Sequence, residues 1–308
     1  MTKPATKYSD PNTPPTELNW RTTLSHAFRH SEELVTALGL TPDNSVPMET
    51  FPMRVPRGFA ERMQPGHPND PLLRQVLPSA DELRTVDGYS ADPVGDLDNV
   101  IPPGGLQKYR GRALLIVTGA CAIHCRYCFR RAYPYASGSL SGQDFQTAMD
   151  VLTADPTIEE VVLSGGDPLT LTNDKLATLF NALTRIKHIK RIRIHTRIPI
   201  ALPERIDSQL LDLISINPRS IIVVIHCNHA REIDDTVTTA VSKLNRAGAV
   251  MLNQSVLLHG VNDSIDTLVD LSERLFDIGV LPYYLHQLDP VAGAAHFNVT
   301  DNRSGPDC

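Results

Sequence analysis

The sequence predicts an α/β fold, a partial (β/α)6 TIM-like barrel that follows an irregular helical N-terminal region. Six apolar, β-rich runs recur after residue 112, and near-continuous apolar strands are typical of a parallel sheet that is covered on both faces. Helix-like stretches separate these runs, and no nucleotide-binding glycine fingerprint is present, which favours a barrel over a doubly wound sheet. The predicted strands span 113–117, 160–164, 191–196, 220–226, 250–258 and 281–286, and the predicted helices span 143–153, 173–187, 206–216, 232–247 and 264–278.

The first third of the chain has a different composition. Its opening residues are rich in Pro, Thr and charged side chains, which predicts disorder. Apolar residues at helical spacing predict a helix between Trp20 and Leu40, and the Pro and Gly residues beyond it predict irregular structure with short helical pieces. We therefore expect a disordered N-terminus at 1–15, a helical region at 16–105, the barrel domain at 106–300 and a tail at 301–308.

Charge and hydropathy exclude two classes of partner. The chain has 308 residues with 29 basic and 35 acidic side chains, a formal net charge of −6, whereas nucleic-acid-binding proteins usually carry a basic excess. No apolar run is long enough to cross a bilayer, and the first twenty residues lack the apolar core of a signal peptide. The sequence predicts a cytoplasmic protein that binds neither nucleic acid nor membrane.

The cysteines carry the strongest chemical signal. Five are present, an odd number that fits a disulfide framework poorly, and three of them form the motif Cys121-Ala-Ile-His-Cys125-Arg-Tyr-Cys128. Three thiolates on one loop can ligate three irons of a [4Fe–4S] cluster and leave the fourth iron open. The open iron can chelate S-adenosylmethionine (SAM), which the reduced cluster then cleaves to a 5′-deoxyadenosyl radical. Zinc held with His124, or three unrelated thiols, are the alternative interpretations.

Several motifs resemble a known family. The Cx3CxxC motif after the first strand, with Tyr127 before its third cysteine, resembles the radical SAM superfamily. The runs CRYCFRRAYPY, LSGGDPL, RIRIHTRIP, IHCNHAREID, LNQSVLLHGVND and YYLHQLDPVAGAAHF resemble the lysine 2,3-aminomutase family, and they are most similar to the branch that makes (R)-β-lysine for modification of elongation factor P. The resemblance spans about residues 50–298 and implies a radical SAM barrel that converts L-α-lysine to β-lysine through a 5′-deoxyadenosyl radical.

The resemblance implies roles for individual residues. Arg130 matches the arginine that binds the substrate carboxylate, and Asp289 matches the aspartate that binds the ε-ammonium of lysine. A solvated arginine and a turn-forming aspartate before Pro290 are the alternatives. The positions that match SAM contacts are Ser164, Gly165, Gly166, Asp167, His195, His226 and Gln254. Each of these is also compatible with an ordinary turn or a satisfied polar group near the core.

The family also uses pyridoxal phosphate. Lys108, Tyr109 and Arg112 match the region that holds its phosphate, although KYRGR is otherwise an unremarkable basic turn. No Schiff-base lysine is found, because the last lysine is Lys243 in a predicted helix and the ending TDNRSGPDC does not match the family. We expect a truncated C-terminal segment, and SAM cleavage that persists while aminomutase turnover is poor.

The sequence is also compatible with two other functional hypotheses. A different radical SAM reaction and an inactive, non-enzymatic member of the family are the two alternatives. The aminomutase interpretation implies lysine as the small-molecule substrate and an electron donor such as flavodoxin or ferredoxin. It is also compatible with a homo-oligomer.

Overall fold

The computed structural model describes residues 19–41, 51–101, 105–135 and 142–300. The predicted disordered segment 1–15 and the predicted tail 301–308 lie outside these residues. None of the helices in the described ranges combines the length and hydropathy that a membrane span requires.

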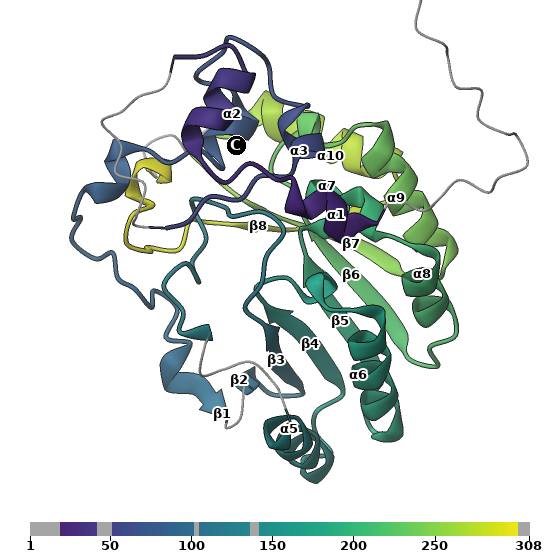
Figure 1. Cartoon of the computed structure of the whole chain (residues 1–308). Helices are drawn as coiled ribbons and strands as arrows, with labels where there is room; N and C mark the ends of the chain where they lie inside the picture. Colours follow the sequence, from purple (N-terminus) through teal and green to yellow (C-terminus); the bar gives the residue numbers. More distant parts are fainter. Residues whose placement is uncertain (1–18, 42–50, 102–104, 136–141, 301–308) are drawn as a thin grey trace, which may run out of the picture.

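An eight-stranded sheet forms the centre of the molecule, and its strands follow one another in chain order from β1 to β8 (Figure 1). The first three strands pair antiparallel, and β3 to β8 are all parallel. The six predicted strands are therefore confirmed, whereas β1 and β2 were not predicted. The strands are β1 Val100–Ile101, β2 Gly105–Tyr109, β3 Arg112–Thr118, β4 Glu160–Gly165, β5 Arg191–Thr196, β6 Ser220–His226, β7 Val250–Val256 and β8 Leu281–His286.

Helices that follow the parallel strands cover one face of the sheet (Figure 1). Four of the long helices begin at a side chain that accepts a hydrogen bond from the backbone of the first turn, which satisfies one of the free N–H groups there. These capping residues are Thr172, Asp207, Asp234 and Ser264. The helices are α5 Gln143–Ala154, α6 Asn173–Arg185, α7 Ile198–Ala201, α8 Ser208–Ser215, α9 Asp235–Arg246 and α10 Ile265–Asp277. Short 3-10 turns lie at Ala80–Leu83, Leu97–Asn99, Pro168–Thr170, Pro203–Arg205, Ala230–Glu232 and Ala295–Phe297.

Side chains along the strands alternate between two faces of the sheet, and only one of these faces packs against the helices. One set of alternate residues, such as Val161 and Leu163 of β4 and Ile192 and Ile194 of β5, packs with the helices in the main hydrophobic core. The other set points to the opposite face of the sheet, which we call the inner face. Polar residues of this second set include Arg112, Glu160, Ser164, Arg191, Arg193, His195, His226 and Gln254.

The N-terminal region contains short helices rather than the predicted continuous helix. Helices α1 Trp20–Ser25 and α2 Ser31–Ala37 are separated because Phe28 pairs with Val55 through two backbone hydrogen bonds of 2.8 and 3.0 Å. Two further short helices, α3 Arg57–Ala60 and α4 Pro71–Arg74, follow. Side chains of all four helices belong to the same hydrophobic core as the barrel, so this region packs directly on the sheet.

Candidate active site

The three motif cysteines lie on the loop that follows β3. All three have free, half-buried thiols. Burial, reinforced by the neighbouring thiols, raises the pKa of Cys121 well above its usual value, and burial and Cys125 raise that of Cys128 to about 11. Among the described residues, no three His, Cys, Asp or Glu side chains are placed to hold a single metal ion. A cluster differs from a single ion because each thiolate binds a different iron.

Residues of the N-terminal region hold this loop from outside. The Arg54 side chain donates to the Cys121 carbonyl at 2.8 Å, and the His124 amide donates to the Arg54 carbonyl at 3.0 Å. The carboxylate of Glu82 accepts from both Arg126 and Arg131, two buried arginines next to the third cysteine. The helical N-terminal region therefore packs against the cysteine loop.

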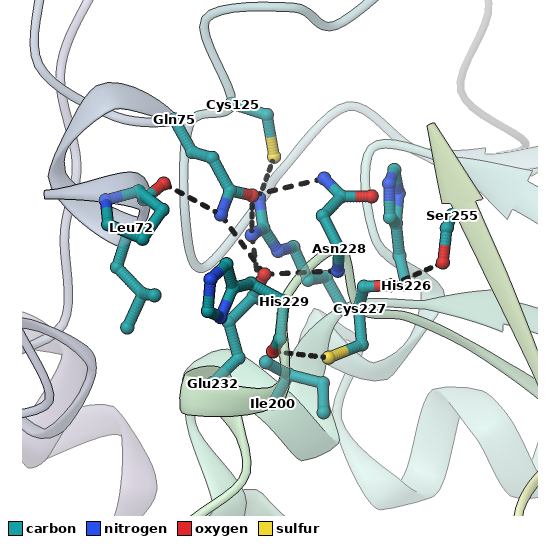
Figure 2. Close-up of polar contacts among 12 residues, drawn as sticks. Leu72, Gln75, Cys125, Ile200, His226, Cys227, Asn228, His229, Glu232 and Ser255 are labelled. Atoms are coloured by element: carbon teal, nitrogen blue, oxygen red, sulfur yellow. Dashed lines mark hydrogen bonds and ion pairs between the residues drawn. The ribbon is translucent and has the colours of Figure 1, made fainter. Parts of the chain in front are cut away.

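A buried polar network lies directly behind Cys125 (Figure 2). Arg197 donates to the Cys125 sulfur at 2.8 Å and to Glu232 at 2.9 Å. Gln75 donates to Glu232 at 3.0 Å, and Asn228 donates to Gln75 at 3.0 Å, so the N-terminal region, β5 and the loop after β6 meet at one point. A buried network of this kind is rigid when all of its members are paired.

The glycine pair after β4 packs against the start of the cysteine loop. A Cβ at Gly166 would lie 2.4 Å from the Ala120 carbonyl oxygen, and one at Gly165 would lie 2.4 Å from that of Thr118. Gly165 also has a φ of +118°, which L side chains rarely adopt. The close approach of the backbone after β3 therefore explains the two glycines without a ligand, because a larger residue at either position would collide with a carbonyl oxygen of that segment.

Asp167 is buried and joins the two loops to β5. Its carboxylate accepts hydrogen bonds from the Leu169 amide at 3.0 Å, the Thr196 hydroxyl at 2.7 Å and the Arg197 amide at 2.7 Å. Burial raises the pKa of Asp167 to about 6, against these hydrogen bonds. The position of this carboxylate relative to the cysteine loop is therefore set by protein groups.

Arg130 lies two residues after the last motif cysteine and is buried. Its Nε donates to Asp96 at 2.8 Å, and its Nη1 donates to the Ser164 hydroxyl at 3.0 Å. Two residues that the sequence motifs place far apart, Arg130 and Ser164, are thus in contact. Asp96 was not expected at the site.

The two predicted histidines and Gln254 lie on the inner face. His226 pairs with Gln254 in the register of β6 and β7, and its ring lies 5.6 Å from that of Tyr127, between ring centroids. Burial, with nearby positive charge, lowers the pKa of both His195 and His226 to about 3. Both imidazoles are therefore neutral near pH 7.

Positive charge accumulates on the inner face at the start of β3 to β5. Glu160 accepts from Arg112 at 2.8 Å, from Arg193 at 3.0 Å and from Arg191 at 3.1 Å. Burial alone would raise the pKa of Glu160, but the hydrogen bond and charge of Arg193 and the charge of Arg112 lower it. One carboxylate faces three guanidinium groups, and the buried Nη1 of Arg193 has no hydrogen-bond partner among the described residues. The side chains of Lys108 and Tyr109 lie outside the described residues.

Asp289 is half-buried in the loop that follows β8. Its carbonyl accepts from the Val291 amide at 2.7 Å, and Val291 forms an isolated bridge with Ser90. The segment before β1 is therefore attached to the loop after β8.

Comparison with known proteins gives the family. The model of the radical SAM superfamily matches residues 115–271. L-lysine 2,3-aminomutase of Escherichia coli is 46% identical over 298 residues, which cover 95% of this chain and 86% of that protein. The chain belongs to the lysine 2,3-aminomutase family. The enzymes of that name from Haemophilus influenzae and Clostridium subterminale are 42% and 32% identical, over 92% and 91% of this chain and 86% and 68% of their own lengths.

The donor groups fit the cofactors that the radical SAM family implies. Cys121 and Cys128, whose pKa values are raised, are poor thiolates by themselves, and bound iron would stabilise their deprotonated form. The unpaired Arg193 nitrogen and the excess of guanidinium groups around Glu160 fit an anionic ligand such as a phosphate. The parallel strands β3 to β8 contain no lysine.

Sequence reasoning missed several residues of this site. Arg197 lies inside the RIRIHTRIP motif and Gln75 inside the predicted helical region, but their contacts join segments more than a hundred residues apart. For Arg197 the available signal was its place in the motif, since a charged residue directly after a buried strand requires a partner. Asp96 and Glu82 had no signal at all in the single sequence.

Proposed function

We propose that this protein is a lysine 2,3-aminomutase, a radical SAM isomerase that converts L-α-lysine to (R)-β-lysine for the modification of elongation factor P. The observation that carries the proposal is the match to L-lysine 2,3-aminomutase of Escherichia coli over 95% of the chain, combined with three thiols on the loop after β3. The substrate is lysine by similarity to these relatives, and the (R) configuration follows the resemblance of the motifs.

Cys121, Cys125 and Cys128 hold the [4Fe–4S] cluster in this proposal. When bound, the reduced cluster supplies the electron that cleaves the sulfonium bond of SAM to methionine and a 5′-deoxyadenosyl radical. The protein contributes a rigid loop that is held by Arg54, by the pair of arginines on Glu82 and by Arg197. A rigid loop keeps the three thiols in a fixed relative arrangement.

The inner face binds SAM and substrate. His195, His226 and Gln254 point toward the space that SAM occupies, and the two histidines, being neutral, can accept or donate hydrogen bonds without adding charge. The backbone of Ser164, Gly165 and Gly166 and the carboxylate of Asp167 border the same space. Arg130 binds the substrate carboxylate through its remaining N–H groups, and Asp289 binds the distant ammonium group.

Arg112 holds the phosphate of pyridoxal phosphate together with Lys108 and Tyr109. When bound, pyridoxal phosphate supplies the imine through which the amino group migrates. The free Nη1 of Arg193 offers a further donor to the same phosphate. The guanidinium groups are kept apart and oriented by the shared carboxylate of Glu160.

The proposal extends to the cellular setting and the organisation of the chain. The protein works in the cytoplasm with a flavodoxin or ferredoxin as electron donor, and it forms a homo-oligomer. The helical region at 16–105 and the barrel domain at 106–300 act as one unit, because they share a core and a cysteine loop. Light scattering of the holoprotein tests the oligomeric state.

The test is an anaerobic assay with two readouts. The protein is reconstituted with iron and sulfide, and then SAM, pyridoxal phosphate, a reductant and L-lysine are added. We expect about four irons per chain, 5′-deoxyadenosine that forms only with SAM and reductant, and β-lysine in excess over it that chiral chromatography identifies as the (R) form. Cys125→Ser is expected to lose iron and both products, whereas Cys227→Ser, which changes a buried cysteine outside the motif, retains the iron. Zinc in place of iron would contradict the proposal.

A second candidate function follows from the inner face. Strands β3 to β8 contain no lysine that could hold pyridoxal phosphate covalently, and SAM cleavage with little aminomutase turnover is therefore the second candidate. Release of 5′-deoxyadenosine without β-lysine would support this second function. β-Lysine formed in large excess over 5′-deoxyadenosine would contradict it, because an aminomutase returns the abstracted hydrogen to the product and regenerates SAM.

A further inference from the structure

Arg197 is the only described side chain that joins a motif cysteine sulfur to a buried carboxylate. It follows β5, is 6% exposed, and its backbone amide is held by Asp167 at 2.7 Å. Its Nη1 donates to the Cys125 sulfur and the Tyr127 hydroxyl, both at 2.8 Å. Its Nη2 donates to Gln75 at 2.6 Å and to Glu232 at 2.9 Å.

The acceptors of Arg197 are themselves fixed. The Glu232 carboxylate also accepts from Gln75 and from the Asn228 amide, each at 3.0 Å. Asn228 donates in turn to the Tyr127 hydroxyl at 2.7 Å. Figure 2 shows Gln75, Asn228 and Glu232 converging beside Cys125. These contacts fix the orientation of the Arg197 guanidinium group, and in this orientation Nη1 donates to the Cys125 sulfur.

This placement leaves one donor of Arg197 unused. Its buried Nε has no hydrogen-bond partner among the described residues. A guanidinium group that served only to neutralise Glu232 could use Nε in a parallel, two-bond pair. Instead, Nη1 donates to the Cys125 sulfur and Nη2 donates to Glu232. The orientation of the guanidinium group therefore keeps the contact with the sulfur while Nε stays unpaired.

We propose that Arg197 is a positioning residue for the iron–sulfur cluster, which raises the cluster's reduction potential by donating a hydrogen bond to the Cys125 sulfur. The inference rests on the proposed function, because it requires a cluster on the cysteine loop. Reduction adds one negative charge to the cluster and its thiolates. A buried cationic donor at one of the sulfurs stabilises the reduced form more than the oxidised form, and hydrogen bonds to the sulfurs are among the features that set such potentials.

The experiment compares reduction potentials of reconstituted holoproteins by redox titration followed by electron paramagnetic resonance. Arg197→Gln removes the charge and one of the two terminal NH2 groups, and Arg197→Lys keeps the charge but cannot serve four acceptors. Arg205→Lys is the matched control, since Arg205 is also a buried arginine but donates to the Leu169 carbonyl and the Asn173 side chain.

We expect the ratio of reduced to oxidised cluster at a fixed ambient potential to fall at least tenfold in Arg197→Gln, which is 59 mV for one electron. Arg197→Lys shifts in the same direction by less, and Arg205→Lys stays at the wild-type value. A merely structural role changes the melting temperature in both lysine variants but leaves the potential unaltered.

The possible outcomes distinguish a failure of this inference from a failure of the proposed function. Wild-type potential in an Arg197 variant that carries a full cluster overturns this inference and leaves the proposed function intact. If Arg197→Gln holds no iron, Arg197→Lys provides the comparison. Loss of iron in both Arg197 variants, with Arg205→Lys fully loaded, also overturns it, because Arg197 would then act in assembly. A wild-type protein that binds no cluster overturns the proposed function itself.

Discussion

Glu82 is the residue whose substitution tests how the cysteine loop is held. Its carboxylate accepts from Arg126 Nε at 2.7 Å and from Arg131 Nη2 at 2.6 Å, and its side chain is 2% exposed. The substitution Glu82→Gln keeps the size of the side chain and removes its charge. Two buried guanidinium groups next to the third motif cysteine then lose their counter-ion.

The size of the effect follows from this burial. Removing one partner of a buried ion pair costs about 3–5 kcal/mol, because the remaining charge stays desolvated. Small domains are stable by only about 5–15 kcal/mol, so the loss is a large fraction of the total. At about 2 °C per kcal/mol for a chain of this size, the melting temperature falls by about 6–10 °C.

The pH dependence of the same variant gives an independent check. Burial would raise the pKa of Glu82, but hydrogen bonds and charge from Arg126 and Arg131 lower it below the usual value. A lowered pKa in the folded state contributes stability that is present above the unfolded pKa and is lost as the pH falls through the folded value. Glu82→Gln is therefore expected to be less sensitive to acid below about pH 4.5 than the wild type.

Circular dichroism melting and iron content after reconstitution measure the outcome. Asp81→Asn is the matched control, because Asp81 pairs with the exposed Arg84 on the surface of the same turn, where such pairs contribute about 0–1 kcal/mol. A Glu82→Gln protein that melts within about 2 °C of the wild type and binds the same iron would refute the reasoning.

Three further changes test the site. Gly166→Ala places a Cβ against the Ala120 carbonyl and is expected to reduce iron binding several-fold. Gly58→Ala, whose Cβ would meet only the Glu204 Oε1 at 4.0 Å, is expected to retain the iron, and iron analysis decides. The folded pKa of His195, about 3, lies below its unfolded value, so the unfolded state binds more protons between these values and acid destabilises the protein; His195→Gln is expected to remove up to about 1.4 kcal/mol per pH unit of that dependence, measured by denaturant unfolding. Arg193→Gln is expected to weaken binding of pyridoxal phosphate about tenfold in a spectroscopic titration, and unchanged affinity would contradict a phosphate site.

Much of the barrel could be predicted because its strands are long and apolar. All six predicted parallel strands are present, and the helix predicted at 143–153 is observed at Gln143–Ala154. The prediction of one helix between Trp20 and Leu40 was wrong, because the backbone of Phe28 pairs with Val55 instead of continuing the helix. Local spacing is insensitive to such a pairing, since the partner lies outside the window that it samples.

The site shows the same division. The three cysteines are neighbours in sequence, so their spacing alone predicted a cluster site, and the sequence motifs also singled out Arg130 and Ser164. The contact between those two, at 3.0 Å, became visible only in the folded chain. The structure adds a second reason for the glycine pair, since the space that a Cβ would need is filled by backbone carbonyls.

By itself the sequence determined the order of the six parallel strands, the family and the thiol loop, because each depends on periodicity or on residues close together in the chain. The tertiary structure alone decided which groups surround that loop: Glu82 on two arginines, Arg197 on the Cys125 sulfur and the three guanidinium groups on Glu160. Hydrogen bonds and ion pairs require atoms within about 3–4 Å, and folding brings such atoms together from segments whose separation in sequence carries no trace of the contact.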